Sequence, residues 1–173
     1  MTLIDPIDSA CQQQVVEHTS HYIALAARLY DRPFAELPVR FNLSGRASGM
    51  YRVRGKHREI RYNPWLFAAH FDDCFQTTVP HEVAHYVVDC LFGLRQVRPH
   101  GKECRAVMAG FGADASVTSN LSLAGIPQRR SRYVTYRCGC GEQPLGIRRH
   151  QRVVNGEARY ACRRCGEVLR RHG

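Results

Sequence analysis

The chain has 173 residues, 44% of them hydrophobic, so it can bury a core and form one domain, or a domain with a small added module. No run of about 18 apolar residues occurs, which excludes a membrane span, and no basic segment followed by an apolar run opens the chain, so we expect no signal peptide. We expect a cytoplasmic monomer whose eight cysteines stay reduced, so that paired cysteines bind metal instead of forming disulfides.

Charge is unevenly distributed along the chain. Residues 1–127 carry 13 lysines and arginines against 12 acidic residues, whereas residues 128–173 carry 12 arginines against 3 glutamates. Such an asymmetry indicates a polyanionic partner, and nucleic acid is the commonest polyanion in a cytosol. A charged surface that serves only solubility would mix both signs more evenly. We therefore predict two parts, a core over residues 1–127 and a basic module over residues 128–173.

The first elements predicted are a long helix and a small sheet. Apolar residues recur at helical spacing from Ile7 to about Tyr30, with Asp5 or Asp8 near the start of the helix. Pro33 and Pro38 then break the chain. Strand-like alternation follows at residues 39–43, 50–53 and 57–62, and Gly55-Lys56 suits a hairpin turn. We expect an antiparallel sheet, then a short helix at residues 65–69.

The stretch from Val79 to Cys90 has the pattern of a metal-binding helix. His81 and His85 are four residues apart, so both imidazoles lie on one face of a helix and can reach one metal ion. Glu82 lies one step round from His81, where its carboxylate could take a proton from a zinc-bound water. The other faces are apolar, so the helix should be buried. A metal ion would satisfy the buried imidazoles and the carboxylate. The alternative is that the histidines are core residues bonded to backbone carbonyls and that Glu82 pairs with an arginine.

A zinc site that keeps one position open for water needs a third protein ligand. We predict His100, which follows His85 by fifteen residues and precedes Gly101, where the backbone can come close to the metal. Glu103 is the competing ligand. Asp89 lies four residues after His85 on the same helix face, and we hypothesise that it orients His85 by accepting a hydrogen bond.

Other signals bound the elements around this site. Thr77 or Thr78 is the expected N-cap of the metal helix, and Gly93 should follow its last residue. The next helix opens after His100-Gly101, with Cys104 on its inner face. Residues 113–132 are rich in serine, threonine, glycine and arginine, and are predicted to be a linker.

Two cysteine pairs in the basic module predict a structural zinc site of the ribbon type. The pairs are separated by strand-like segments at residues 147–149, 152–154 and 158–161, and Asn155-Gly156 favours a hairpin turn between the last two. Four thiolates would hold zinc with no open position, and the metal would replace a core that so short a module cannot build. The predicted ligands are Cys138, Cys140, Cys162 and Cys165. Because the first pair is spaced by one residue, His150 could take the place of Cys140.

The arginines of the basic module are the predicted contacts with nucleic acid. The chosen residues are Arg148, Arg149, Arg163 and Arg164, and a second possible patch is Arg129, Arg130 and Arg132.

Taken together, these motifs resemble the SprT-like metalloprotease family. The resemblance covers most of the chain and is carried by residues 79–85, by residues 99–103 and by the C-terminal segments 136–140, 148–150, 152–154, 156–158 and 160–166. It implies an α+β fold with a small zincin-like core and a C-terminal β zinc ribbon. It also implies that His81, His85 and His100 bind the catalytic zinc and that Glu82 is the general base. The chain departs from the family at Cys104, where relatives tend to have a bulky aromatic residue.

The resemblance also implies a relation to Spartan, the eukaryotic DNA-dependent protease that degrades proteins crosslinked to DNA. We therefore expect a zinc endopeptidase that binds DNA through its C-terminal module and acts on DNA-bound or crosslinked proteins, with one catalytic and one structural zinc. The alternative is a nucleic-acid-binding zinc protein whose helix metal site is structural or inactive.

Overall fold

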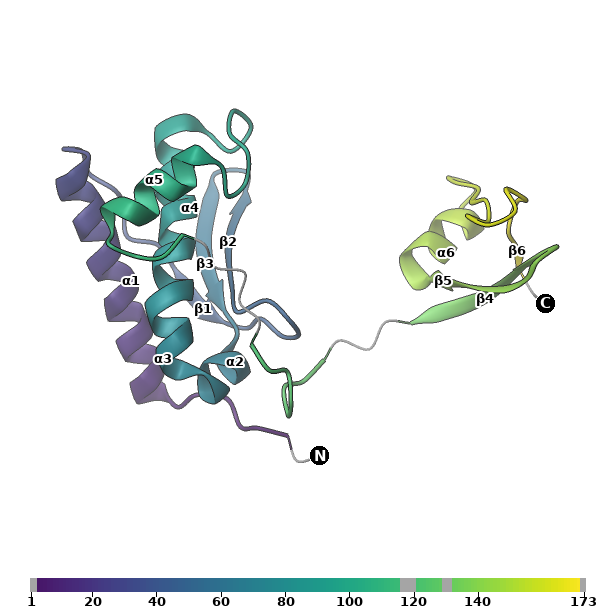
Figure 1. Ribbon diagram of the computed structural model, residues 1–173, viewed down its shortest axis with the longest axis horizontal. Coiled ribbons are helices and arrows are strands. Elements are labelled where there is room, and N and C mark those ends of the chain that lie inside the picture. Colours follow the sequence, from purple (N-terminus) through teal and green to yellow (C-terminus); the bar gives the residue numbers. More distant parts are fainter. Residues whose placement is uncertain (1–2, 116–120, 129–131, 172–173) are drawn as a thin grey trace. The chain divides into compact units, whose positions relative to one another are not determined.

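The computed structural model describes residues 3–115, 121–128 and 132–171, and the structural statements below concern these residues. The chain forms two compact units, residues 1–128 and residues 129–173, which we call the core unit and the C-terminal unit. Both combine helices with a small sheet (Figure 1), which confirms the predicted α+β class. None of the helices in the described ranges has both the length and the apolar character needed to cross a bilayer.

Helix α1 (Ser9–Leu29) opens the core unit, as predicted. The side chain of Asp8 caps it by accepting a hydrogen bond from the backbone amide of Cys11 at 2.8 Å. Its apolar stripe, including Val15 and Ala26, is buried. This stripe packs on α4 (Val79–Phe92), which lies between α1 and the sheet (Figure 1).

The sheet of the core unit contains β1 (Val39–Phe41), β2 (Gly49–Arg54) and β3 (His57–Tyr62) in the order β1-β3-β2. The β2–β3 hairpin is antiparallel as predicted, but β1 pairs with β3 in parallel, so the prediction of a wholly antiparallel sheet was wrong. The strand directions still alternate along the chain. Only the order differs, because β3 carries the fully buried Ile60 and Tyr62 and takes the central position.

The metal helix has no separate start. Helices α2 (Pro64–Ala69) and α3 (Phe71–Asp73) lead into a π-helical turn, Cys74–Thr78, that runs directly into α4. Thr78 has helical dihedral angles and makes no capping hydrogen bond, and the Thr77 hydroxyl donates to the carbonyl of Asp73 at 2.6 Å. The predicted threonine N-cap was therefore wrong, because the chain is already helical at that point.

Helix α4 ends as predicted and is held by the core. Gly93 follows it with a φ of 77°, a left-handed value that glycine adopts without strain. Val79, Val83 and Val87 on α4 are fully buried, and each contributes about 1.5–3 kcal/mol through the removal of its side chain from water. The core also includes residues of α5 (Lys102–Gly110), so α4 is packed from several sides.

Part of the predicted linker belongs to the core unit. Ile126 is 4% exposed and packs in the core, and the Ile4 amide donates to the carbonyl of Gly125 at 3.0 Å. Burial and pairing of this kind rule out a free linker over residues 121–128. Residues 116–120 and 129–131 of the same prediction lie outside the described residues.

The C-terminal unit contains β4 (Tyr133–Cys138), β5 (Gly141–Gly146), α6 (Ile147–Val154) and β6 (Arg170–Arg171), and its antiparallel sheet has the order β5-β4-β6. The predicted strands at 147–149 and 152–154 were wrong, since this segment is helical. The half-buried residues of this helix are His150 and Val153, three positions apart as on one helix face, whereas Ile147 and Val154 are exposed. Gly156, with a φ of 73°, follows the helix and does not turn a hairpin.

Candidate metal centres and the cleft beside one of them

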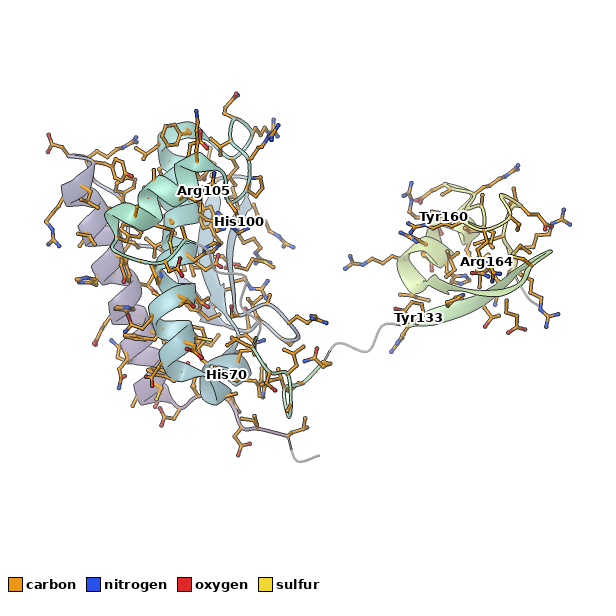
Figure 2. The ribbon with its side chains drawn as sticks, viewed as in Figure 1. His70, His100, Arg105, Tyr133, Tyr160 and Arg164 are labelled. Carbon is orange, nitrogen blue, oxygen red and sulfur yellow. The ribbon has the colours of Figure 1, made fainter. Side chains whose placement is uncertain are left out.

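Three imidazoles meet in the core unit. His81 and His85 lie one turn apart on α4, and their Nε2 atoms are 3.0 Å from each other. The ring centroid of His100, which comes from the loop before α5, lies 4.8 Å from that of His81 and 4.9 Å from that of His85. Figure 2 labels His100 beside the upper part of α4. The structure therefore brings together the three residues that the sequence predicts as ligands of one zinc ion.

A tight turn presents His100 to the helix. His100 has a φ of 56°, which is unusual for a residue other than glycine, and the Gly101 amide donates to the carbonyl of Arg98 at 2.9 Å. A Cβ atom on Gly101 would lie only 2.8 Å from that carbonyl oxygen, so glycine is required there. His81, His100 and Cys104 form one group of donor atoms, and His85 adjoins it through its Nε2 atom, 3.0 Å from that of His81; the competing ligand Glu103 is not in the group.

Cys104 is a neighbour of the histidines that the sequence did not predict. Its sulfur and nitrogens of His81 and His100 all lie within 4.8 Å of one another, and its side chain is 4% exposed. Burial raises the pKa of its thiol. The signal available in the sequence was its position one helical turn after His100, but a single cysteine on an apolar helix face is more typical of a core residue.

The histidine group suits a metal cation. Burial lowers the pKa of His85 to about 4, with further lowering from the neighbouring His81 and His100, and burial also lowers the pKa of His81. Both rings are therefore neutral at pH 7, which is the form that binds metal. Nitrogen and sulfur donors are those that zinc prefers in proteins, so the group is compatible with zinc.

Glu82 lies beside this group in a nearly closed environment. Its side chain is 7% exposed, and one carboxylate oxygen accepts a hydrogen bond from the backbone amide of Tyr51 at 2.5 Å. Burial raises the pKa of this carboxyl group to about 7, although the hydrogen bond opposes the rise. A Cβ atom on Gly49 would lie 2.6 Å from the Cγ atom of Glu82, so glycine allows β2 to approach the carboxylate.

A cleft of about 440 Å³ opens over His81, Glu82 and His85. Strand β2, at the edge of its sheet, forms one wall, and the loop at residues 94–100 forms the other. The cleft walls are largely apolar, with side chains of Met50, Val88, Leu94, Val97 and Pro99. An edge strand with unpaired backbone groups beside an open cleft is a place where an extended peptide can add as a further strand.

Asp89 has a different role from the one predicted. Its carboxylate accepts hydrogen bonds from the Tyr51 hydroxyl at 2.8 Å, from Arg58 at 2.9 Å and from the Leu94 amide at 3.3 Å. Burial acts to raise the pKa of Asp89, but these bonds outweigh it and the pKa is lowered. Within the described residues it makes no hydrogen bond to His85. Asp89 instead joins the end of α4 to both walls of the cleft.

The second candidate centre is the cysteine group of the C-terminal unit. The sulfur atoms of Cys138, Cys140, Cys162 and Cys165 all lie within 4.8 Å of one another, and those of Cys140 and Cys162 are 3.5 Å apart. Tetrahedral zinc with bonds to sulfur of about 2.3 Å would hold its sulfurs about 3.8 Å apart. The group is therefore compatible with zinc.

The surroundings of the cysteines also suit a metal centre. Backbone hydrogen bonds from Cys165 and Arg164 lower the pKa of Cys162 to about 6, towards the thiolate that zinc binds. The alternative ligand His150 is not in the group of four sulfur atoms. Its Nδ1 atom instead lies 3.1 Å from the hydroxyl oxygen of Tyr136, within hydrogen-bonding distance.

The predicted nucleic-acid residues are exposed on two elements of the C-terminal unit. Arg148 and Arg149 lie on α6, and Arg163 and Arg164 lie in the turn between the last two cysteines. Arg149, Arg163 and Arg164 line one cavity of about 280 Å³ together with Tyr160, and the Arg149 guanidinium lies 5.7 Å from the Tyr160 ring centroid. Figure 2 labels Tyr160 and Arg164. Arg129 and Arg130 of the alternative patch lie outside the described residues.

Comparison with known proteins gives one family. The model of the SprT-like family matches residues 16–123. Protein SprT of Vibrio parahaemolyticus is 37% identical over 148 residues, which cover 85% of this chain and 86% of that protein. Protein SprT of Klebsiella pneumoniae is 37% identical over 164 residues, which cover 94% of this chain and 95% of that protein.

Protein SprT of Yersinia pestis is 37% identical over 169 residues, which cover 97% of this chain and 94% of that protein. No solved structure matches the chain. Because the family model spans more than half of the chain and these relatives span nearly all of it, the chain belongs to the SprT-like family, whose membership indicates a metalloprotease type of function.

Proposed function

We propose that this chain is a zinc-dependent endopeptidase that acts on proteins held on DNA. The observation that carries the proposal is the position of Glu82, nearly buried beside three converging imidazoles at the floor of an open cleft. His81, His85 and His100 would hold the zinc ion. A zinc ion in that place would polarise the scissile carbonyl and lower the pKa of a bound water.

The chain's own groups account for the remaining chemistry. The edge of β2 orients an extended substrate through backbone hydrogen bonds. Glu82 takes the proton of the attacking water and later delivers it to the leaving amine, and a pKa near 7 allows both transfers at neutral pH. The hydrogen bond from the Tyr51 amide fixes the carboxylate for these transfers.

The tie to DNA comes from the C-terminal unit. Its exposed arginines supply positive charge, and Tyr160 beside Arg149 offers an aromatic ring against which a base can stack. Holding the chain on DNA would raise the local concentration of DNA-bound proteins at the cleft.

The test compares cleavage of one unfolded protein substrate, free and covalently attached to DNA. We expect chelator-sensitive cleavage that is faster on the attached substrate. Replacement of Arg148, Arg149, Arg163 and Arg164 by alanine should reduce this advantage and leave cleavage of the free substrate unchanged. If the wild-type chain cleaves neither substrate with zinc bound, the proposal is wrong.

Cys104 favours a second candidate function, that of a nucleic-acid-binding zinc protein whose core site is structural. Three histidines with the Cys104 thiolate would give four protein ligands and leave no open position for water. The two candidates therefore differ in whether Cys104 binds the metal.

Replacement of Cys104 by alanine decides between these candidates. We expect the variant to keep its zinc and its rate of cleavage, because three histidines suffice as ligands of a zinc site with one open position. Zinc analysis and cadmium NMR of the cadmium-loaded protein measure this without reference to activity. Loss of this zinc, with a marked upfield shift of the matching cadmium resonance, would identify Cys104 as a ligand and favour the structural site.

A further inference from the structure

The core unit is nearly neutral as a whole, but its basic and acidic residues lie in different segments of the chain. Residues 39–62 contain 7 lysines and arginines and 1 glutamate, whereas residues 1–38 and 63–128 together contain 6 lysines and arginines and 11 acidic residues. The sheet segment is therefore strongly basic, and the remainder of the unit is acidic. A surface that serves only solubility intersperses the two signs, so this separation calls for a partner.

Strand register puts the basic side chains on one face of the sheet. Arg52 lies opposite Glu59 and Arg40 lies opposite Arg61, while Ile60 and its alternate neighbours face the core. Successive side chains of a strand point to opposite faces, so Arg54 shares the face of Arg52. We call this surface, together with the exposed Lys56 of the hairpin turn, the basic sheet face. Its basic residues are Arg40, Arg52, Arg54, Lys56 and Arg61.

Internal pairing neutralises only part of this charge. Glu59 is the one acidic residue on the described face, and it pairs with both Arg40 and Arg52. Arg61 donates to the Asn42 side chain at 2.7 Å, which fixes its guanidinium but leaves its charge in place. Arg54, Lys56 and Arg61 have no acidic partner among the described residues, so their positive charges remain for an anion.

The basic sheet face adjoins the cleft. Met50 precedes Arg52 by two residues, so it lies on the same face of β2, and it also lines the cleft together with His81 and Glu82. Helix α4 packs on the core face of β2 (Figure 1), whereas the basic sheet face is the opposite face. A ligand on the basic sheet face would therefore lie beside the cleft and would not cover the metal-binding residues of α4.

We propose that the basic sheet face binds the phosphate backbone of DNA and holds it alongside the cleft. The inference deepens the proposed function, because a protein attached to that DNA would then be presented to the zinc centre by the core unit itself. Guanidinium groups bind phosphate through two parallel hydrogen bonds, and a row of them follows a backbone without reading its sequence.

The experiment uses the full chain with Arg54 and Lys56 both replaced by glutamine. Both residues are exposed, and neither has an acidic partner in the described part of the chain, so the fold should be unaffected. We expect the variant to bind DNA duplexes more weakly than wild type, by the same factor whatever their sequence. The slope of log affinity against log salt concentration should be smaller in magnitude than that of wild type by about 1.8. The matched control is Arg28→Gln with Arg32→Gln, which removes the same charge outside the sheet and the cleft and should leave the slope unchanged.

Two outcomes would overturn the proposal. One is a salt slope in Arg54→Gln/Lys56→Gln equal to that of wild type. The other is unchanged DNA binding with lost binding of an acidic protein, which would assign the face to a protein partner. Cleavage of the free unfolded substrate is measured in parallel. If wild type binds DNA but never cleaves, the proposed function fails while the slope still decides the role of the basic sheet face.

Discussion

Replacement of Glu82 by glutamine is expected to lower the rate of cleavage at least about 100-fold, since proton transfer by a positioned carboxylate contributes factors of about 10² to 10⁴. Glutamine has nearly the same shape but cannot take a proton from water. Its side-chain oxygen can still accept the hydrogen bond that the Tyr51 amide donates to Glu82 at 2.5 Å. The variant should therefore keep its fold, its zinc and its affinity for DNA, and it should lose only the chemistry.

The matched control is Glu103→Gln, which changes the nearest glutamate after His100 in the chain. We expect this variant to cleave at the wild-type rate and to keep both zinc ions, because Glu103 is outside the group of donor atoms. Cleavage of the free substrate, zinc content and thermal unfolding are measured for both variants. Cleavage at the wild-type rate by Glu82→Gln would exclude Glu82 as the general base.

The histidines could be predicted because each follows from a simple rule. Helical periodicity places His81 and His85 on one face, and an open zinc site requires a third ligand, for which His100 was the best candidate. The partners of Asp89 could not be predicted in this way. They come from Tyr51 and Arg58, more than 30 positions earlier in the chain, and depend on how the hairpin packs against α4.

The C-terminal unit and the sheet show two other limits of the sequence. Residues 147–154 contain valines, which favour strands, yet the segment is helical and none of its residues is fully buried. Charge counted over residues 1–127 gave a nearly neutral core. A count over residues 39–62 alone shows a basic segment, but only the register of β1, β2 and β3 shows that its arginines share one face.

Replacement of Cys162 by serine is expected to have the largest effect on structure. Cys162 is the most buried of the four cysteines, and two backbone hydrogen bonds favour its thiolate. A structural zinc site contributes about 10–16 kcal/mol to the folding of a small domain, far more than a unit of this size gains from its core. We expect one zinc per chain in place of two, an unfolded C-terminal unit and loss of most DNA binding.

The core unit has its own hydrophobic core, so it should survive this change. We expect cleavage of the free unfolded substrate to continue at the wild-type rate, while the advantage of the DNA-attached substrate is reduced. NMR of the full chain would show collapsed dispersion only for amides of residues 132–171. Cys11→Ser is the matched control, since Cys11 lies on α1 outside both donor groups, and it should keep two zinc ions. Two zinc ions in Cys162→Ser would show that the cysteine group does not hold a structural metal.

DNA binding that persists after the C-terminal unit unfolds would have to come from the core unit, where the basic sheet face is the surface with the charge to provide it.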